Sequence, residues 1–191
     1  AGGENACILH YNENNKLLND GDLLLIDAGC EILGYASDIT RTFPVNGRFS
    51  NAQKEIYEIV LNAQVQAIAS IMPGGDVNKP HEIACEIITR GLMKLGIMND
   101  ISNLREFYMH GTGHWLGLDV HDVGAKEIDN SFRKFEVGMV TTVEPGIYIR
   151  KDNKIDPKYW NIGIRIEDDV LVTLDGNHIL SEAAIKNVDD I

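Results

Sequence analysis

The sequence predicts a single α+β domain. Apolar, strand-like segments lie toward both ends of the 191-residue chain, and two segments with helical spacing lie between them. This grouping is typical of α+β folds, whereas strands that alternate with helices favour a parallel sheet. A chain of 191 residues suits one domain with a sizeable core, so we expect residues 1–191 to form one unit.

The first strand pair is expected near the N-terminus. Residues 22–28 (DLLLIDA) form a short apolar run of the kind found in buried strands. Residues 30–34 are expected to form the turn of a hairpin, and residues 35–45 the returning strand. If the two strands pair antiparallel, the carboxylates of Asp27 and Asp38 can face one another across the ladder.

Two helices are expected in the middle of the chain. Ser50, followed three residues later by Gln53, is a capping box, and apolar residues recur at helical spacing from there to Ile71. Pro73-Gly74-Gly75 is expected to end this helix. The second helix is expected over about residues 80–95. Its expected apolar residues are Ile83, Ile87, Met93 and Leu95.

A second strand pair is expected after the helices. Residues 138–149 and 162–174 are apolar enough to form two long strands, and Asp175-Gly176 is a turn signal. The first of these strands carries Glu144 and the second carries Glu167. Each end of the chain therefore offers a strand pair with one carboxylate on each strand.

Composition narrows the classes of function. The net charge of −12 argues against nucleic acid or an acidic membrane surface as the partner, since both attract basic patches. Cys7, Cys30 and Cys85 are odd in number and form no CxxC pair, which favours a reducing compartment over a disulfide framework. No apolar run is long enough for a membrane span and no signal peptide is visible, so a cytoplasmic location is expected.

Histidines cluster in one glycine-rich segment, MHGTGHWLGLDVH. His110, His114 and His121 are three of the six histidines in the chain. The glycines between them argue against a helix, and therefore against the helical HExxH zinc motif. We expect His114 to be a metal ligand, which leaves His110 and His121 for substrate contacts or for outer-shell roles.

Four carboxylates complete the candidate site: Asp27, Asp38, Glu144 and Glu167. Each lies in a mainly apolar run, where an acid needs a partner because burial of an unpaired charge is costly. Taken singly, each has an ordinary structural interpretation, such as a loop cap, a turn residue or a salt bridge between Glu167 and Arg165. Taken together with the histidine segment, they favour a shared cation, since close carboxylates otherwise repel.

The donor set indicates the type of metal and reaction. Four carboxylates and one imidazole are rich in oxygen, which favours Mn²⁺ or Co²⁺ over thiolate-selected Zn²⁺, with Zn²⁺ and Fe²⁺ left open. Four negative ligands balance two divalent ions. Two ions about 3.5–4 Å apart hold and acidify a water, which is chemistry for hydrolysis of an amide or ester.

Five motifs in order resemble one known family. LIDAGCE, GYASDITRTFPVNG, MHGTGHWLGLDVHDVG, TVEPGIYI and GIGIRIEDDVLV together resemble the pita-bread (creatinase/aminopeptidase) metallopeptidases, and within them the aminopeptidase P group. The resemblance runs from about residue 5 to the C-terminus. It implies a pita-bread fold for a catalytic domain that lacks the N-terminal domain and opening helices of the family.

The resemblance also implies roles for individual residues. Asp27 would bind one metal, Asp38 and Glu167 would bridge the pair, and His114 and Glu144 would bind the other metal. The residues that it places on the catalytic or substrate-contacting wall are His10, His110, His121, Tyr148 and Arg165. Glu144 would also move a proton toward the leaving amine.

The implied reaction is metal-dependent removal of an N-terminal residue that precedes proline, from peptide substrates. The alternative is prolidase, which cleaves Xaa-Pro dipeptides with the same five ligands. Methionine aminopeptidase fits the sequence after the histidines less well, and a non-catalytic binding protein fits poorly because all five ligands are present. The resemblance is compatible with a homo-oligomer.

Overall fold

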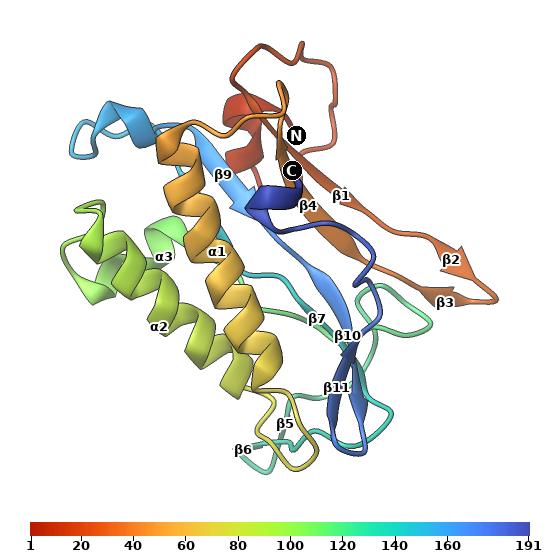
Figure 1. Cartoon of the computed structure of the whole chain (residues 1–191). Helices are drawn as coiled ribbons and strands as arrows, with labels where there is room; N and C mark the ends of the chain where they lie inside the picture. Colours follow the sequence, from red (N-terminus) through yellow and green to blue (C-terminus); the bar gives the residue numbers. More distant parts are fainter.

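The computed structural model describes residues 1–191 and confirms an α+β fold (Figure 1). Two long helices, α1 and α2, pack against each other on one side of an array of antiparallel strands. The helices are α1 (Asn51–Ala69), α2 (Lys79–Lys94) and α3 (Leu104–Phe107), with 3₁₀ turns at Gly3–Cys7, Ile101–Asn103, Pro157–Tyr159 and Val188–Asp190. The strands are β1 (Leu23–Ala28), β2 (Glu31–Ile32), β3 (Tyr35–Ala36), β4 (Ile39–Pro44), β5 (Glu127–Ile128), β6 (Ser131–Phe132), β7 (Val140–Val143), β8 (Gly146–Ile149), β9 (Ile162–Arg165), β10 (Asp168–Thr173) and β11 (Gly176–Ile179).

The first helix begins where the capping box predicts. The Ser50 side chain accepts a hydrogen bond from the Gln53 backbone, and the Gln53 side chain accepts one from the Ser50 backbone. Two otherwise unpaired backbone donors are satisfied in this way. The helix ends at Ala69, and Gly75 follows in the predicted Pro-Gly-Gly turn.

The second helix has the predicted bounds, but its buried face differs from the prediction. Ala84, Ile88 and Leu92 are fully buried, whereas Met93 is exposed. Gly91 explains the close approach of α1, because a Cβ atom at this position would lie 2.7 Å from the Ile59 side chain. The helix carries apolar residues on more than one face, and contact with α1 decides which face is buried.

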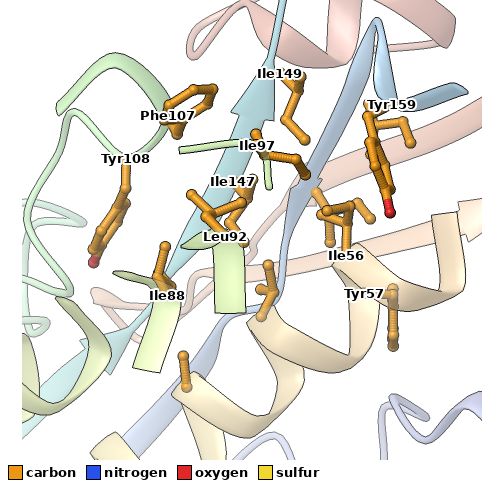
Figure 2. Close-up of a cluster of buried hydrophobic side chains, with 14 of the residues drawn as sticks. Ile56, Tyr57, Ile88, Leu92, Ile97, Phe107, Tyr108, Ile147, Ile149 and Tyr159 are labelled. Atoms are coloured by element: carbon orange, nitrogen blue, oxygen red, sulfur yellow. The ribbon is translucent and has the colours of Figure 1, made fainter. Parts of the chain in front are cut away.

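The main core lies between the helices and the strands β8 and β9 (Figure 2). Ile56 of α1, Ile88 and Leu92 of α2, and Ile147 and Ile149 of β8 are all completely buried there. Burial of each such side chain stabilises the fold by about 1.5–3 kcal/mol. The core thereby holds the helices rigidly against the strands that carry the candidate site.

Three of the expected long strands are interrupted. The predicted strand 35–45 divides into β3 and β4, strand 138–149 into β7 and β8, and strand 162–174 into β9 and β10. β7 pairs with β10, whereas β8 pairs with β9. The short strand β11, which pairs with β10, was not predicted from its polar sequence. No helix is both long and apolar enough to cross a membrane.

Candidate metal centre

Each interruption places a carboxylate at the end of a ladder. Asp38 directly precedes β4, Glu144 directly follows β7, and Glu167 lies between β9 and β10. Asp27, the fourth carboxylate, lies within β1 and pairs with Thr40. Asp38 lies two residues before the partner of Asp27, so the two carboxylates meet on one face of the ladder as diagonal neighbours, which agrees with the prediction.

The interrupted ladders turn these side chains toward one cavity of about 300 Å³. The five expected metal ligands and all but one of the expected catalytic or substrate-contacting residues lie on its wall; the exception is Tyr148, which is completely buried behind the wall. The residues on the wall are His10, Asp27, Asp38, His110, His114, His121, Glu144, Arg165 and Glu167, accompanied by Leu9, Gly111 and Gly113. A larger, mainly polar hollow of about 770 Å³ lies near the N-terminal segment, away from these groups.

Three of the expected metal ligands lie within coordination range of one ion. Donor atoms of Asp38, His114 and Glu167 all lie within 4.8 Å of one another. The His114 Nε2 atom is 3.4 Å from Asp38 Oδ2 and 3.8 Å from Glu144 Oε1. On the other side of the ring, Nδ1 is 3.0 Å from the carbonyl oxygen of Trp115, which can only accept. Neutral His114 therefore carries its proton on Nδ1, which leaves the Nε2 lone pair for a metal ion. Without an ion, desolvation is outweighed by the hydrogen bonds with Asp38 and Trp115 and by the nearby carboxylates, which together raise the pKa of His114.

The carboxylates hold an unfavourable amount of negative charge in a partly dehydrated site. Desolvation, together with the neighbouring acids, raises the pKa of Glu167 to about 9. Desolvation likewise raises the pKa of Glu144 to about 7 and outweighs the attraction of His114 and Arg165. For Asp38, desolvation is opposed by hydrogen bonds and by the two imidazoles nearby, so that its pKa is lowered.

A network of donors holds the ligands from behind. Arg165 Nη2 donates to Asp27 Oδ2 at 2.6 Å, and Arg165 Nη1 donates to the Tyr148 hydroxyl at 3.0 Å. Because the guanidinium only donates, the Tyr148 hydroxyl is free to donate to His110 Nε2, 2.8 Å away. Desolvation lowers the pKa of His110 to about 4, so this histidine is neutral at neutral pH.

A second network anchors the start of β10, directly after Glu167. Asp168 is completely buried and accepts hydrogen bonds from Arg41 at 2.7 Å, from Gln64 at 2.6 Å, and from Lys186 and Ser181. Arg41 also donates to the backbone oxygen of Glu167. The buried charge of Asp168 is paired in this way, and the backbone that leads from Glu167 into Asp168 is held in place.

The glycine-rich segment allows the histidines to approach the strands closely. A Cβ atom on Gly113 would lie 2.0 Å from the backbone oxygen of Thr142, so only glycine fits at this position. The Thr142 hydroxyl accepts from the backbone of His114 at 3.1 Å. His121 packs edge-on against His114, with ring centroids 4.4 Å apart, and His10 reaches the same cavity from the N-terminal segment.

Sequence reasoning missed several residues that contact the site. The hydroxyl of Thr40 donates to Glu167 Oε2 at 2.7 Å, and Asp169 Oδ2 accepts from the backbone of Asp38 at 3.2 Å. His81 Nδ1 and the Thr112 hydroxyl form a 2.8 Å hydrogen bond behind the histidine segment. Thr40 could have been found, because alternate residues of a strand share a face and Thr40 follows Asp38 by two.

Comparison with known proteins places the chain in a family. The model of metallopeptidase family M24 matches residues 1–174, and the chain belongs to this family. The Xaa-Pro aminopeptidase of Haemophilus influenzae is 56% identical over 198 residues, and that of Escherichia coli is 51% identical over 196 residues. These matches cover 100% and 99% of this chain, but 46% and 44% of the two relatives.

Solved structures agree with the sequence match. The structure of Pseudomonas aeruginosa aminopeptidase PepP superposes with a TM-score of 0.96 at 53% identity and covers 100% of this chain. The match spans 45% of that chain, so this chain corresponds to less than half the length of its relatives. Its fold is the α+β pita-bread fold that the motifs predict.

The residues present fit the divalent metals that membership of a metallopeptidase family implies. Carboxylate oxygens and an imidazole nitrogen line the cavity together. Arg165 is the cationic side chain on the same wall, and it contacts Asp27. The raised pKa values of Glu144 and Glu167 indicate how costly these two charges are without a counter-ion. An oxygen-rich donor set of this kind suits hard or borderline divalent ions.

Proposed function

We propose that this chain carries the catalytic part of a metal-dependent Xaa-Pro aminopeptidase. The reaction is hydrolysis of the peptide bond between an N-terminal residue and a following proline. One observation carries the proposal: the five expected metal ligands, three further histidines and Arg165 converge on one cavity. The relatives that bear the name Xaa-Pro aminopeptidase support the choice of substrate.

The proposed ligands of two divalent ions are Asp27, Asp38, His114, Glu144 and Glu167. Mn²⁺ is the proposed ion because oxygen donors dominate the set, with Co²⁺, Zn²⁺ and Fe²⁺ as the alternatives. When bound, such ions supply Lewis acidity, which lowers the pKa of a water and polarises the scissile carbonyl.

The protein side chains supply proton transfer and orientation. Glu144, which lies on the cavity wall, is proposed to move a proton toward the leaving proline nitrogen. Neutral His110 is locked between Tyr148 and the carbonyl oxygen of Gly111, 2.8 Å from its Nδ1 atom. His110 therefore presents a fixed, uncharged face to the substrate, while His10 and His121 line the rest of the wall.

The proposed partners are peptides with proline at the second position. A bond that precedes proline is a tertiary amide without an N–H group, so a site that recognises it needs no acceptor for that hydrogen. Residues 1–191 are proposed to act as one catalytic domain. The expectations of a cytoplasmic setting and of a homo-oligomer stay predictions.

A panel of peptides tests the proposal. The full chain is assayed with Mn²⁺ on the tripeptides Ala-Pro-Ala, Ala-Ala-Ala and Met-Ala-Ala and on the dipeptide Ala-Pro. We expect release of alanine from Ala-Pro-Ala that stops with a chelator and returns with Mn²⁺. Fast cleavage of Ala-Pro alone would show a prolidase. Cleavage that is the same with Mn²⁺ and with chelator, or no cleavage of any peptide, would contradict a metal-dependent enzyme.

A further inference from the structure

One hydroxyl lies between the two groups that organise the metal centre. Thr40 is completely buried in β4, and its Oγ1 atom is 2.7 Å from Glu167 Oε2. Arg165 Nε lies 3.2 Å from the same Oγ1 atom. The hydroxyl therefore bridges a guanidinium and a carboxylate that the proposed function assigns to metal binding.

The direction of this bridge is fixed by chemistry. A guanidinium nitrogen can only donate, so Arg165 occupies an acceptor position on Thr40 Oγ1. The single hydroxyl proton is left for Glu167, which must accept it. The β-branched side chain restricts rotation about χ1, so the hydroxyl cannot easily turn elsewhere.

The backbone adds a second contact between the same two residues. The backbone N–H of Glu167 donates to the carbonyl oxygen of Thr40 at 3.0 Å. Glu167 is thus held by Thr40 at both its backbone and its carboxylate. Arg165 in turn donates to Asp27 Oδ2 at 2.6 Å, so one guanidinium holds Asp27 directly and Glu167 through the hydroxyl.

We propose that Thr40 is a positioning residue of the metal centre, whose hydroxyl, oriented by Arg165, holds the Glu167 carboxylate toward Asp38 and His114. The inference rests on the proposed dinuclear metal site. Removal of an outer-shell partner of a metal ligand typically lowers metal affinity by about 10–100-fold. Without the hydroxyl, the Glu167 carboxylate would have to be ordered each time an ion binds. The substitution should therefore lower the measured affinity for the metal ion.

The strand offers a matched control. Thr42 is also completely buried, lies two residues further along β4, and makes two hydrogen bonds with its hydroxyl. Both partners are backbone atoms of Arg165: the carbonyl oxygen at 2.9 Å and the N–H at 3.2 Å. Thr42→Val therefore removes the same buried hydroxyl without touching a carboxylate.

The test is calorimetric titration of Mn²⁺ into the metal-free full chain and into Thr40→Val, Thr40→Ser and Thr42→Val. We expect Thr40→Val to lower the affinity of the more weakly bound Mn²⁺ ion at least about 10-fold. Thr40→Ser, which restores a hydroxyl, and Thr42→Val should stay within about 2-fold of the unsubstituted protein. The electron paramagnetic resonance signal of a coupled Mn²⁺ pair should be lost selectively from Thr40→Val at limiting Mn²⁺.

Three outcomes would overturn the inference. Thr40→Val could bind both ions with unchanged affinity, or Thr42→Val could weaken binding as much as Thr40→Val does. An unsubstituted protein that binds fewer than two ions would instead refute the proposed dinuclear site on which the inference rests. Urea denaturation of each metal-free variant checks the fold, and Thr40→Ala replaces Thr40→Val in the same test should the latter not fold.

Discussion

The metal-free protein should lose stability as the pH rises through the neutral and mildly alkaline range. Burial and neighbouring acids raise the pKa of Glu167 from 4.5 to about 9 in the folded protein. Between these two values, the folded state binds one more proton than the unfolded state does. The stability that this proton confers is fully present below pH 4.5 and is lost as the pH rises toward 9.

The size of the effect follows from the same shift. One pH unit corresponds to about 1.4 kcal/mol for one proton, and the slope flattens as the pH reaches the folded pKa. The free energy of unfolding should therefore fall by about 2 kcal/mol between pH 7 and pH 9 because of Glu167. Glu144, with a pKa of about 7, is half titrated at pH 7 and adds only about 0.4 kcal/mol to the fall. His110, with a pKa of about 4, is already neutral at pH 7 and adds little.

Urea denaturation of the full chain at pH 7, 8 and 9 measures this fall, with chelator and with saturating Mn²⁺. Bound ions should keep Glu167 ionised throughout, so the fall should be absent from the metal-loaded protein. Glu167→Gln should also remove it, because the amide does not titrate. Equal stability of the metal-free protein at pH 7 and pH 9 would refute the reasoning.

Three further predictions concern single substitutions. Asp38→Asn should lower Mn²⁺-dependent peptide cleavage by orders of magnitude and weaken Mn²⁺ binding; an unchanged rate in excess Mn²⁺ would contradict its role as a ligand. Ile88→Ala, at a completely buried position of α2, should lower the free energy of unfolding by about 2–5 kcal/mol. Met93→Ala, at an exposed position of the same helix, should change it by less than about 0.5 kcal/mol. Equal losses in urea denaturation would refute the assignment of the buried face. Gly113→Ala should displace the histidine segment, since the new Cβ would lie 2.0 Å from the backbone oxygen of Thr142. Calorimetry should then show weaker Mn²⁺ binding. An unchanged Mn²⁺ affinity would show that the segment tolerates a side chain at this position.

Local signals in the sequence predicted the helices, the four carboxylates and the histidine cluster of the cavity wall, whereas His10 and Arg165 were expected there only from the family resemblance. The capping box of Ser50 and Gln53 fixes the start of α1 through hydrogen bonds within four residues. Acids in apolar runs next to glycine-rich histidines predicted which side chains would meet, because such groups need partners. The roles of these residues as metal ligands stay predictions.

Features that depend on distant pairing could not be predicted. Strand periodicity alone does not show that β7 and β8 pair with different strands, and so it gave no sign of the break that holds Glu144. The buried face of α2 likewise depends on contact with α1, where Gly91 admits Ile59. The hydroxyl of Thr40 gains its importance only when β4 lies beside Glu167, more than 120 residues further along the chain.

Anomalous diffraction at the manganese absorption edge, from crystals of the full chain grown with Mn²⁺, tests the central claim most directly. The proposed metal centre predicts two strong anomalous peaks in the cavity, in contact with Asp27, Asp38, His114, Glu144 and Glu167. A cavity without anomalous peaks at saturating Mn²⁺, or peaks bound only by other residues, would contradict the assignment of these side chains as the ligands of a dinuclear peptidase.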